Sequence, residues 1–265
     1  MRIATTRCSL VLRLIDAVTG EPPGRRAPVR VAVQDLHTRR PIAKPGGWLA
    51  FTDLPSGQVR LQVESAAFLE RVITVDIERL DPLHPIFTLV LYPRPDAALP
   101  AGTTALRSRL VDADGAPIVG AEVRGCLIEE RAVRARLVQA APAGAAAIDV
   151  TAIRGKLCPG DRYRIRARSD GAAQDVIVDE SYPGGVFLRG PLSSPCERGS
   201  MLLPIACAIT GPDGRFLLPL RQPLPALVTL DLEAGASNPL GRFELTEGRI
   251  SGPDALVWPG SPDIS

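Results

Sequence analysis

Apolar and polar residues alternate with a period of two through much of the chain. Val29, Val31 and Val33 are separated by Arg30 and Ala32, and the segment 59–64 alternates in the same way. Strict alternation puts every second side chain on one face, which is typical of a strand with one buried face. Further short apolar segments lie at 9–15, 48–51, 72–77 and 86–91. Six or seven short strands in about 85 residues predict a β-sandwich.

The order of these signals recurs later in the chain. The run from Arg13 to Ala17 is matched by the run from Arg109 to Ala113, and 59–64 is matched by 228–233. From Arg13 to Gly47 is 34 positions, whereas from Arg109 to the equivalent Gly214 is 105 positions. We therefore expect two copies of one module, the second with an insertion of 71 residues.

The alternation and the repeat together predict an all-β fold with two tandem Ig-like or transthyretin-like β-sandwich domains. The first spans 1–95, a Pro-rich linker spans 96–104, and the second spans 105–265 with a β-rich insertion at about 127–205. Strand candidates in the insertion are 149–153, 162–168 and 175–178, and the alanine-rich 140–147 predicts a flexible crossing. The alternative is a degenerate third module, because 159–165 resembles the turn and strand at 56–61.

Composition supports short strands and excludes several classes. The chain has 24 glycines, 26 prolines and 4% aromatic residues, which disfavours long helices. A net charge of +2 and a pI of about 8.4 do not indicate a nucleic-acid binder. Five widely spaced cysteines without a Cys-x-x-Cys pair predict free thiols and no zinc ribbon. Cys158 and Cys196 are the pair that could approach each other.

Two segments of the second copy carry a family resemblance. The text from Leu110 to Val123 contains Asp114-Gly115-Ala116-Pro117, and Thr210-Gly211-Pro212-Asp213-Gly214-Arg215-Phe216 follows later. Asp114-Gly115 supplies a tight turn with positive φ at the glycine. This pattern resembles the carboxypeptidase regulatory-like family, a transthyretin-like or prealbumin-like β-sandwich. The resemblance covers about 130 residues and none of the insertion.

The resemblance implies a non-catalytic accessory or scaffolding module. The related intradiol dioxygenases hold non-haem iron through two Tyr and two His, with the His pair downstream of the Asp-Gly-Arg-Phe-like strand. Here the only histidines are His37 and His84, and none follows Gly214. Iron bound in that way is therefore not expected.

The sequence gives little support for catalysis, nucleotide binding or calcium binding. Neither histidine has a Cys or Ser nucleophile beside it in the sequence, and both are interpreted as structural. No phosphate-binding glycine loop or Gly-x-Ser-x-Gly motif is present. Asp112, Asp114 and Asp213 could suggest calcium, but their turn positions explain them. We predict no catalytic residue, no cofactor and no metal.

The sharpest local feature is a row of arginines. Arg162, Arg164, Arg166 and Arg168 would lie on one face of a strand. Such a face could bind an acidic partner, or it could pair with neighbouring acids such as Asp175. Trp258, close to the C-terminus, could dock a tail onto this protein or onto a neighbouring subunit. We take these five residues as the candidate interaction face.

The leading hypothesis is a non-enzymatic structural or protein-interaction protein, such as a subunit of a phage-tail-like bacterial assembly. It would bind a protein partner or a second copy, and neither nucleic acid nor membrane. One alternative is a carbohydrate- or ligand-binding module, which needs an exposed aromatic platform around Trp48 or Trp258. The other is an enzyme with a site in the insertion. Arginines interrupt the N-terminal apolar stretch, which predicts a cytoplasmic protein, with export inside an assembly as the alternative.

Overall fold

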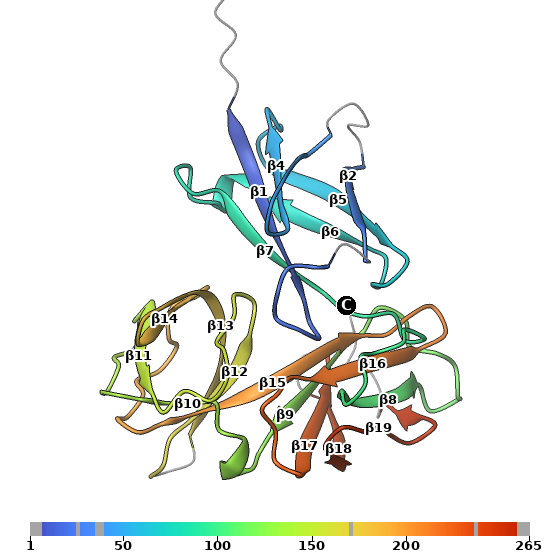
Figure 1. The fold of residues 1–265 in the computed structure, drawn as a ribbon, viewed down its shortest axis with the longest axis vertical. Coiled ribbons are helices and arrows are strands. Elements are labelled where there is room, and N and C mark those ends of the chain that lie inside the picture. The colour runs from blue at the N-terminus through green and yellow to red at the C-terminus, as the bar shows by residue number, and fades with distance from the viewer. Residues whose placement is uncertain (1–6, 25–26, 35–39, 170–171, 236–237, 259–265) are drawn as a thin grey trace, which may run out of the picture. The chain divides into compact units, whose positions relative to one another are not determined.

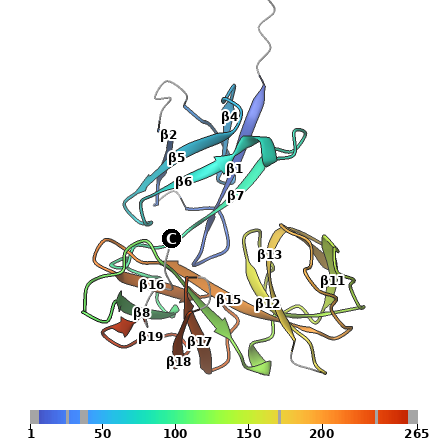
Figure 2. The ribbon, with the colours of Figure 1, turned by 180° about the vertical axis from the view of Figure 1, so that it is seen from behind.

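The computed structural model describes residues 7–24, 27–34, 40–169, 172–235 and 238–258. Within these residues the protein is all-β, and its helical elements are two 3₁₀ turns, η1 (Ile77–Arg79) and η2 (Glu130–Ala132). The predicted all-β class is therefore confirmed. No described helix is long and apolar enough to span a membrane. The chain divides into two units, Met1–Pro93 and Arg94–Ser265, each with its own core (Figures 1 and 2).

The first unit is a seven-stranded sandwich. One sheet has the order β3-β4-β1-β7, and the facing sheet has the order β2-β5-β6. The strands are β1 (Cys8–Asp16), β2 (Val29–Val33), β3 (Ile42–Lys44), β4 (Trp48–Thr52), β5 (Gln58–Ser65), β6 (Arg71–Asp76) and β7 (Ile86–Leu91). The alternation read from the sequence is observed directly, since Val59, Leu61 and Val63 of β5 are buried in this core.

The second unit contains a sandwich of related topology. One sheet pairs β8 with β16, β19 and β20, and the facing sheet has the order β15-β9-β17-β18. Its strands are β8 (Thr104–Val111), β9 (Glu122–Leu127), β15 (Met201–Ile209), β16 (Arg215–Leu220), β17 (Leu227–Ala234), β18 (Asn238–Thr246), β19 (Ile250–Ser251) and β20 (Leu256–Val257). In both units the first strand pairs antiparallel with the strand after the glycine turn and parallel with the last strands.

The two copies also share hydrogen bonds at the glycine turn. The amide of Leu14 donates to the carbonyl oxygen of Gly47 at 3.0 Å, and the amide of Leu110 donates to that of Gly214 at 2.8 Å. Both glycines have positive φ, +74° and +77°, and a Cβ at either would crowd the partner strand's backbone. The turn glycine Gly115 has a φ of +84°, as its tight turn requires. The repeat read from the sequence therefore extends to individual backbone bonds.

The insertion folds as a closed six-stranded antiparallel barrel. Its own strands are β10 (Ala135–Leu137), β11 (Ala147–Thr151), β12 (Arg162–Arg166), β13 (Ala173–Tyr182) and β14 (Gly185–Leu188). The order β10-β11-β14-β13-β12-β15 closes because β15 pairs with both β12 and β10. This arrangement is not a third copy of the sandwich. Apolar side chains fill the barrel, including Leu137, Ile148, Ile165, Val178 and Leu202.

Strand β15 belongs to both parts of the second unit. Its first residues, Met201 and Leu202, pair with β10 and β12, whereas the stretch from Ile205 to Ile209 pairs with β9 of the sandwich. Figure 1 shows the strand running from the barrel into the sandwich. The sandwich and the barrel are therefore joined by a continuous, hydrogen-bonded sheet.

Two details differ from the sequence expectations. The segment 140–147 is not a loose crossing, because Ala141 and Cys196 exchange backbone hydrogen bonds at 2.9 and 2.8 Å and Gly144 donates to Leu192. The residues after Pro93 belong to the second unit, where Arg107 donates to the carbonyl oxygen of Ala97 at 3.2 Å. Alanine and proline composition gave no sign of these hydrogen bonds.

Candidate functional site

The arginine row lies where the barrel meets the sandwich. Arg162, Arg164 and Arg166 alternate along β12 with Tyr163 and Ile165, which point into the barrel core. The arginines therefore lie on the outer face of the sheet that continues through β15 to β9 and β17. Arg168 lies beyond the end of β12 and is exposed. The structure thus places three of the four arginines on one face of a strand.

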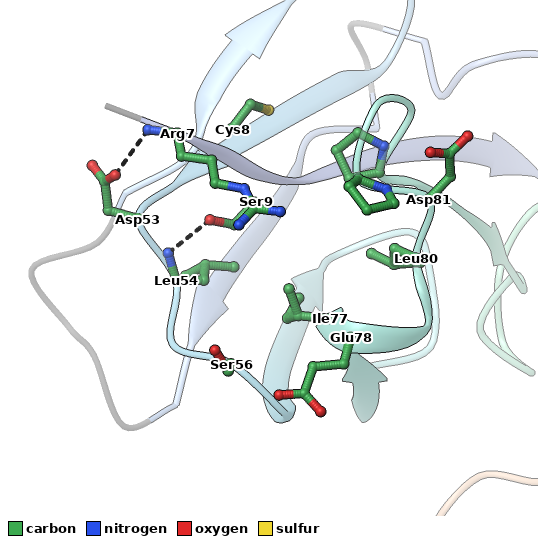
Figure 3. Close-up of a pocket in the computed structure, with 12 residues that line it drawn as sticks. Arg7, Cys8, Ser9, Asp53, Leu54, Ser56, Ile77, Glu78, Leu80 and Asp81 are labelled. Carbon is green, nitrogen blue, oxygen red and sulfur yellow. Dashed lines mark hydrogen bonds between the residues drawn. The ribbon is translucent and has the colours of Figure 1, made fainter. Parts of the chain in front are cut away.

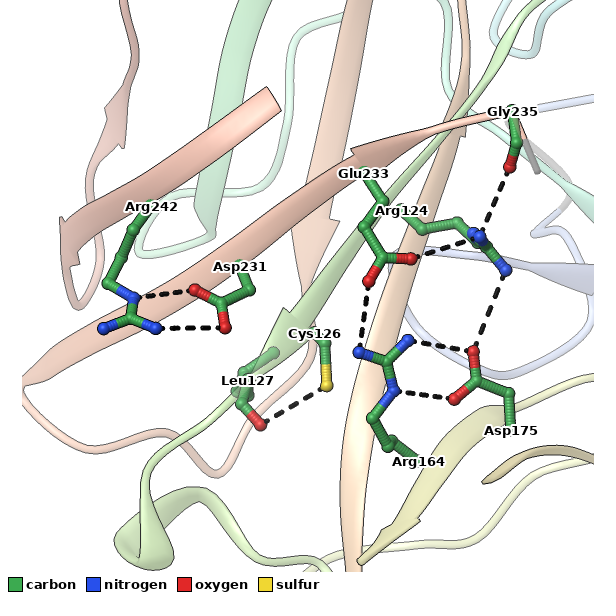
Figure 4. A network of polar contacts seen from close by, with 9 residues as sticks. All are labelled: Arg124, Cys126, Leu127, Arg164, Asp175, Asp231, Glu233, Gly235 and Arg242. Atoms are coloured by element: carbon green, nitrogen blue, oxygen red, sulfur yellow. Dashed lines mark hydrogen bonds and ion pairs between the residues drawn. The ribbon is translucent and has the colours of Figure 1, made fainter. Parts of the chain in front are cut away.

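Arg164 is at the centre of a network of ion pairs (Figure 4). Its Nε and Nη2 donate to the two oxygens of Asp175 at 2.7 and 3.1 Å, and its Nη1 donates to Glu233 at 3.2 Å. Arg124 donates to the other oxygen of Glu233 at 3.1 Å and to the carbonyl oxygen of Gly235 at 3.3 Å. These contacts join β12 and β13 of the barrel to β9 and β17 of the sandwich.

The neighbouring arginines also have partners within the unit. Arg162 forms a bidentate pair with Glu122 of β9, and Arg166 donates to the carbonyl oxygen of Ile128 at 3.3 Å. Hydrogen bonds to Asp175 raise the pKa of Arg164 and keep it charged. The sequence suggested Asp175 as a partner. Glu122 and Glu233 were missed because they lie 40 and 69 positions away from Arg162 and Arg164.

Apolar side chains and thiols lie on the sheet among these charges. Cys126 of β9 and Cys207 of β15 are buried, and desolvation raises their pKa to about 11 and about 12. Both thiols therefore stay protonated near neutral pH, where only a thiolate would be a strong nucleophile. All five cysteines are free, so Cys158 and Cys196 do not form a disulfide. Figure 4 places the Cys126 thiol between the Arg164 and Asp231 pairs.

A second polar cluster surrounds the buried carboxylate of Asp161, which directly precedes β12. Asp161 is 5% exposed and accepts hydrogen bonds from the Tyr163 hydroxyl at 2.9 Å, from the Cys158 amide at 2.8 Å and from Arg221. Nearby, Arg134 donates to the carbonyl oxygens of Arg154, Arg221 and Gln222. Arg154 belongs to the insertion and Arg221 follows β16, so Arg134 is a second connection between barrel and sandwich. Burial lowers its pKa.

The two tryptophans pack against their own units. The Arg13 guanidinium lies 4.7 Å from the centroid of the Trp48 ring, and Phe51 on the same strand is 1% exposed. The amide of Trp258 donates to Val111 at 2.7 Å, and its ring packs against the second sandwich core. Trp258 therefore docks the C-terminal segment onto its own unit. Neither residue forms the exposed aromatic platform that the ligand-binding alternative required.

A pocket of about 460 Å³ with a mixed polar and apolar lining lies in the first unit (Figure 3). Its lining includes Arg7, Cys8, Asp53, Glu78 and Asp81. The Arg7 amide donates to Asp53 at 3.0 Å, and Ser9 Oγ accepts from the amide of Leu54 at 3.0 Å. Among the described residues, the lining contains no histidine, and His84 pairs with the lining residue Asp81.

The remaining candidates have structural roles. His84 pairs with Asp81 at 3.4 Å in an exposed loop, and His37 lies outside the described residues. Asp112 accepts from the turn amides of Asp114 and Ala116, and Asp213 accepts from Arg215. Among the described residues, no three His, Cys, Asp or Glu side chains gather closely enough to hold a metal ion.

No protein-family model matches the sequence, and no curated protein matches it. Structural similarity was found to bacterial pilins. The shaft pilin SpaA from Lactobacillus rhamnosus GG is 9% identical, with 98% of this chain and 100% of that chain covered and a TM-score of 0.23. The major pilin subunit BcpA of Bacillus cereus is 11% identical, with 97% and 70% covered and a TM-score of 0.23. A streptococcal ancillary pilin is 11% identical, with 98% and 100% covered and a TM-score of 0.19. The fold assignment rests on the strands, sheets and cores described above.

Proposed function

We propose that this protein is a non-enzymatic structural protein that binds other proteins, as a subunit of a larger bacterial assembly. The proposal rests on the charged residues where the barrel joins the sandwich, because they bind one another within the chain. Arg124 pairs with Asp175, Arg162 with Glu122 and Arg164 with Glu233, and each of these ion pairs fixes the barrel against the sandwich. A phage-tail-like particle is one example of such an assembly.

The chemistry of the second unit also favours a structural role. The unit contains no histidine, and desolvation raises the pKa of Cys126, Cys196 and Cys207. The barrel that forms most of the insertion is filled by apolar side chains. These features favour a scaffold over an enzyme housed in the insertion. The Asp-Gly-x-Pro turn pattern supports membership of the carboxypeptidase regulatory-like group, whose modules serve as accessories.

The arginine row is a poor surface for an acidic partner. Such a partner would have to displace Glu122, Asp175 and Glu233 from bonds that are already made, and would leave those carboxylates without their cations. Of the candidate interaction face, Arg168 is the arginine that lies outside this arrangement. We therefore place protein binding elsewhere on the surface.

The test is the mass of the native protein together with whatever accompanies it. The protein would be purified at native abundance under mild conditions, cross-linked, and measured by light scattering after size exclusion. We expect a mass well above the 28.2 kDa of one chain, with specific cross-links to a partner or a second copy. A lone 28.2 kDa monomer without cross-linked protein would overturn the proposal.

A further inference from the structure

The outer surface of the barrel carries an aromatic pair that takes no part in the ion-pair network. Tyr182 ends β13 and Phe187 lies in β14, and their ring centroids are 4.9 Å apart with the planes tilted by 51°. Val186, between Gly185 and Phe187, points into the barrel core, so its neighbours point outward. Phe187 remains 48% exposed. The barrel thus displays two neighbouring rings on its outer face.

Glycine at position 185 fixes the orientation of the Tyr182 ring. Gly185 lies directly opposite Tyr182 in the antiparallel ladder. A Cβ at this position would lie 2.2 Å from Cζ of Tyr182, so the ring covers the backbone of β14 at close range. Because one face of the ring rests on the strand, the other face points away from it. The aromatic surface is therefore held in place before any partner binds.

A carboxylate is held at the edge of this surface. The Tyr182 hydroxyl donates to one oxygen of Asp149 at 2.9 Å, and the Gln139 amide donates to the other at 3.1 Å. Both donors are neutral, Asp149 is exposed, and none of the ion pairs among the described residues involves it. Burial and the neighbouring carboxylate raise the pKa of Tyr182, which keeps its hydroxyl a donor. Asp149 thus presents an oriented negative charge without a cation.

We propose that Tyr182, Phe187 and Asp149 bind the guanidinium group of an arginine on a partner protein. A cation is attracted to the face of an aromatic ring, and a planar guanidinium can also hydrogen-bond to a carboxylate. The chain makes similar stacks internally, with Arg13 over Trp48 at 4.7 Å and Arg71 over Tyr92 at 5.2 Å. This inference rests on the proposed function, because it names the chemistry of one partner contact.

The test is an NMR titration of the full chain with ring-labelled tyrosine and phenylalanine. With three tyrosines and six phenylalanines, the Tyr182 and Phe187 signals can be assigned by substitution. The probe is N-acetyl-arginine methylamide, and the matched neutral probe is N-acetyl-citrulline methylamide, which has nearly the same shape. We expect the arginine probe to shift both ring signals in the millimolar range and the citrulline probe to shift them much less.

Two variants test the assigned residues. Asp149→Asn should weaken binding of the arginine probe by about two- to fivefold, as should Phe187→Ala. Glu247→Gln removes an equal charge at another exposed position and should leave binding unchanged. Equal shifts with citrulline, larger shifts with a neutral monosaccharide, or full binding by Asp149→Asn would each overturn this inference. None of these results changes the mass of the native assembly, so the proposed function fails or stands on its own test.

Discussion

Arg164 and Arg242 make the same bond in two different surroundings. Each is a cross-strand arginine whose Nε donates to an aspartate at 2.7 Å, to Asp175 and Asp231 respectively. The Arg164 side chain is 24% exposed and that of Arg242 is 64% exposed. Arg164 also binds Glu233, whereas Asp231 is the acid that Arg242 pairs with among the residues that the structure describes. The two residues therefore separate the effect of the surroundings from that of the bond.

Substitution of these two arginines should have unequal effects on stability. Arg164→Gln leaves Asp175 and Glu233 with less cationic compensation in a partly buried site, so we expect a loss of about 1–3 kcal/mol in the free energy of unfolding. Arg242→Gln should cost much less than Arg164→Gln, because the pair is largely solvated. Urea unfolding of both variants measures the difference, and equal losses would contradict the role assigned to the network.

Much of the residue pattern could be read from the sequence, but the partners of the arginines could not. The alternation in 162–168 predicted that Arg162, Arg164, Arg166 and Arg168 share a face of one strand. The structure places the first three there, because β12 ends at Arg166. Their bonding to Glu122 and Glu233 depends on which strands become neighbours, and a period of two carries no information on that. The Tyr182–Gly185 contact was missed for the same reason.

At the scale of elements, the glycine turn defines both copies of the sandwich. Gly214 has a φ of +77°, and a Cβ there would lie 2.6 Å from the carbonyl oxygen of Leu110. Gly115 also has a positive φ, +84°, but open space surrounds the position of its missing Cβ. Gly214 is thus required both by its backbone conformation and by the lack of room for a Cβ, whereas Gly115 is required by its backbone conformation alone.

Alanine substitution distinguishes these two requirements. Gly115→Ala should cost about 1 kcal/mol, the strain of a left-handed conformation in a residue with a side chain. Gly214→Ala should cost about 2–4 kcal/mol, because β8 and β16 must also separate at their first pairing. Thermal unfolding followed by circular dichroism compares the two. If Gly115→Ala proved as costly as Gly214→Ala, the close approach would not be the cause.

The strands themselves were largely predictable, whereas the barrel was not. The apolar segment 86–91 coincides with β7, and the alternating segment 59–64 lies within β5. A short apolar or alternating segment is enough to predict such a strand. Closure of the barrel depends on pairing between β10 and β15, which lie more than 60 positions apart, and on β15 serving two partners along its length. Several strands share a similar apolar–polar pattern, so the sequence does not show which of them pair.

At the scale of the whole molecule, β15 should make the barrel and the second sandwich unfold together. Leu202, on β15, is fully buried in the barrel core. Leu202→Ala should cost about 2–5 kcal/mol and speed amide exchange in β9 and β17 as well as in the barrel. Leu61→Ala is the matched control, since Leu61 is equally buried in the core of the first unit. Faster exchange confined to the barrel strands would show that the two parts open separately.

The shared strand also limits which insertions and deletions this protein can tolerate during evolution. Sliding β15 by one residue would turn Leu202 and Ala208 away from the cores that they help to fill, because side chains alternate between faces. In an ordinary sheet that error harms one core, but here Leu202 belongs to the barrel and Ala208 to the sandwich. A single insertion or deletion within β15 would therefore put the strand out of register with at least one of the two cores. We expect length variation among descendants of this chain to fall in its turns and to spare these nine residues.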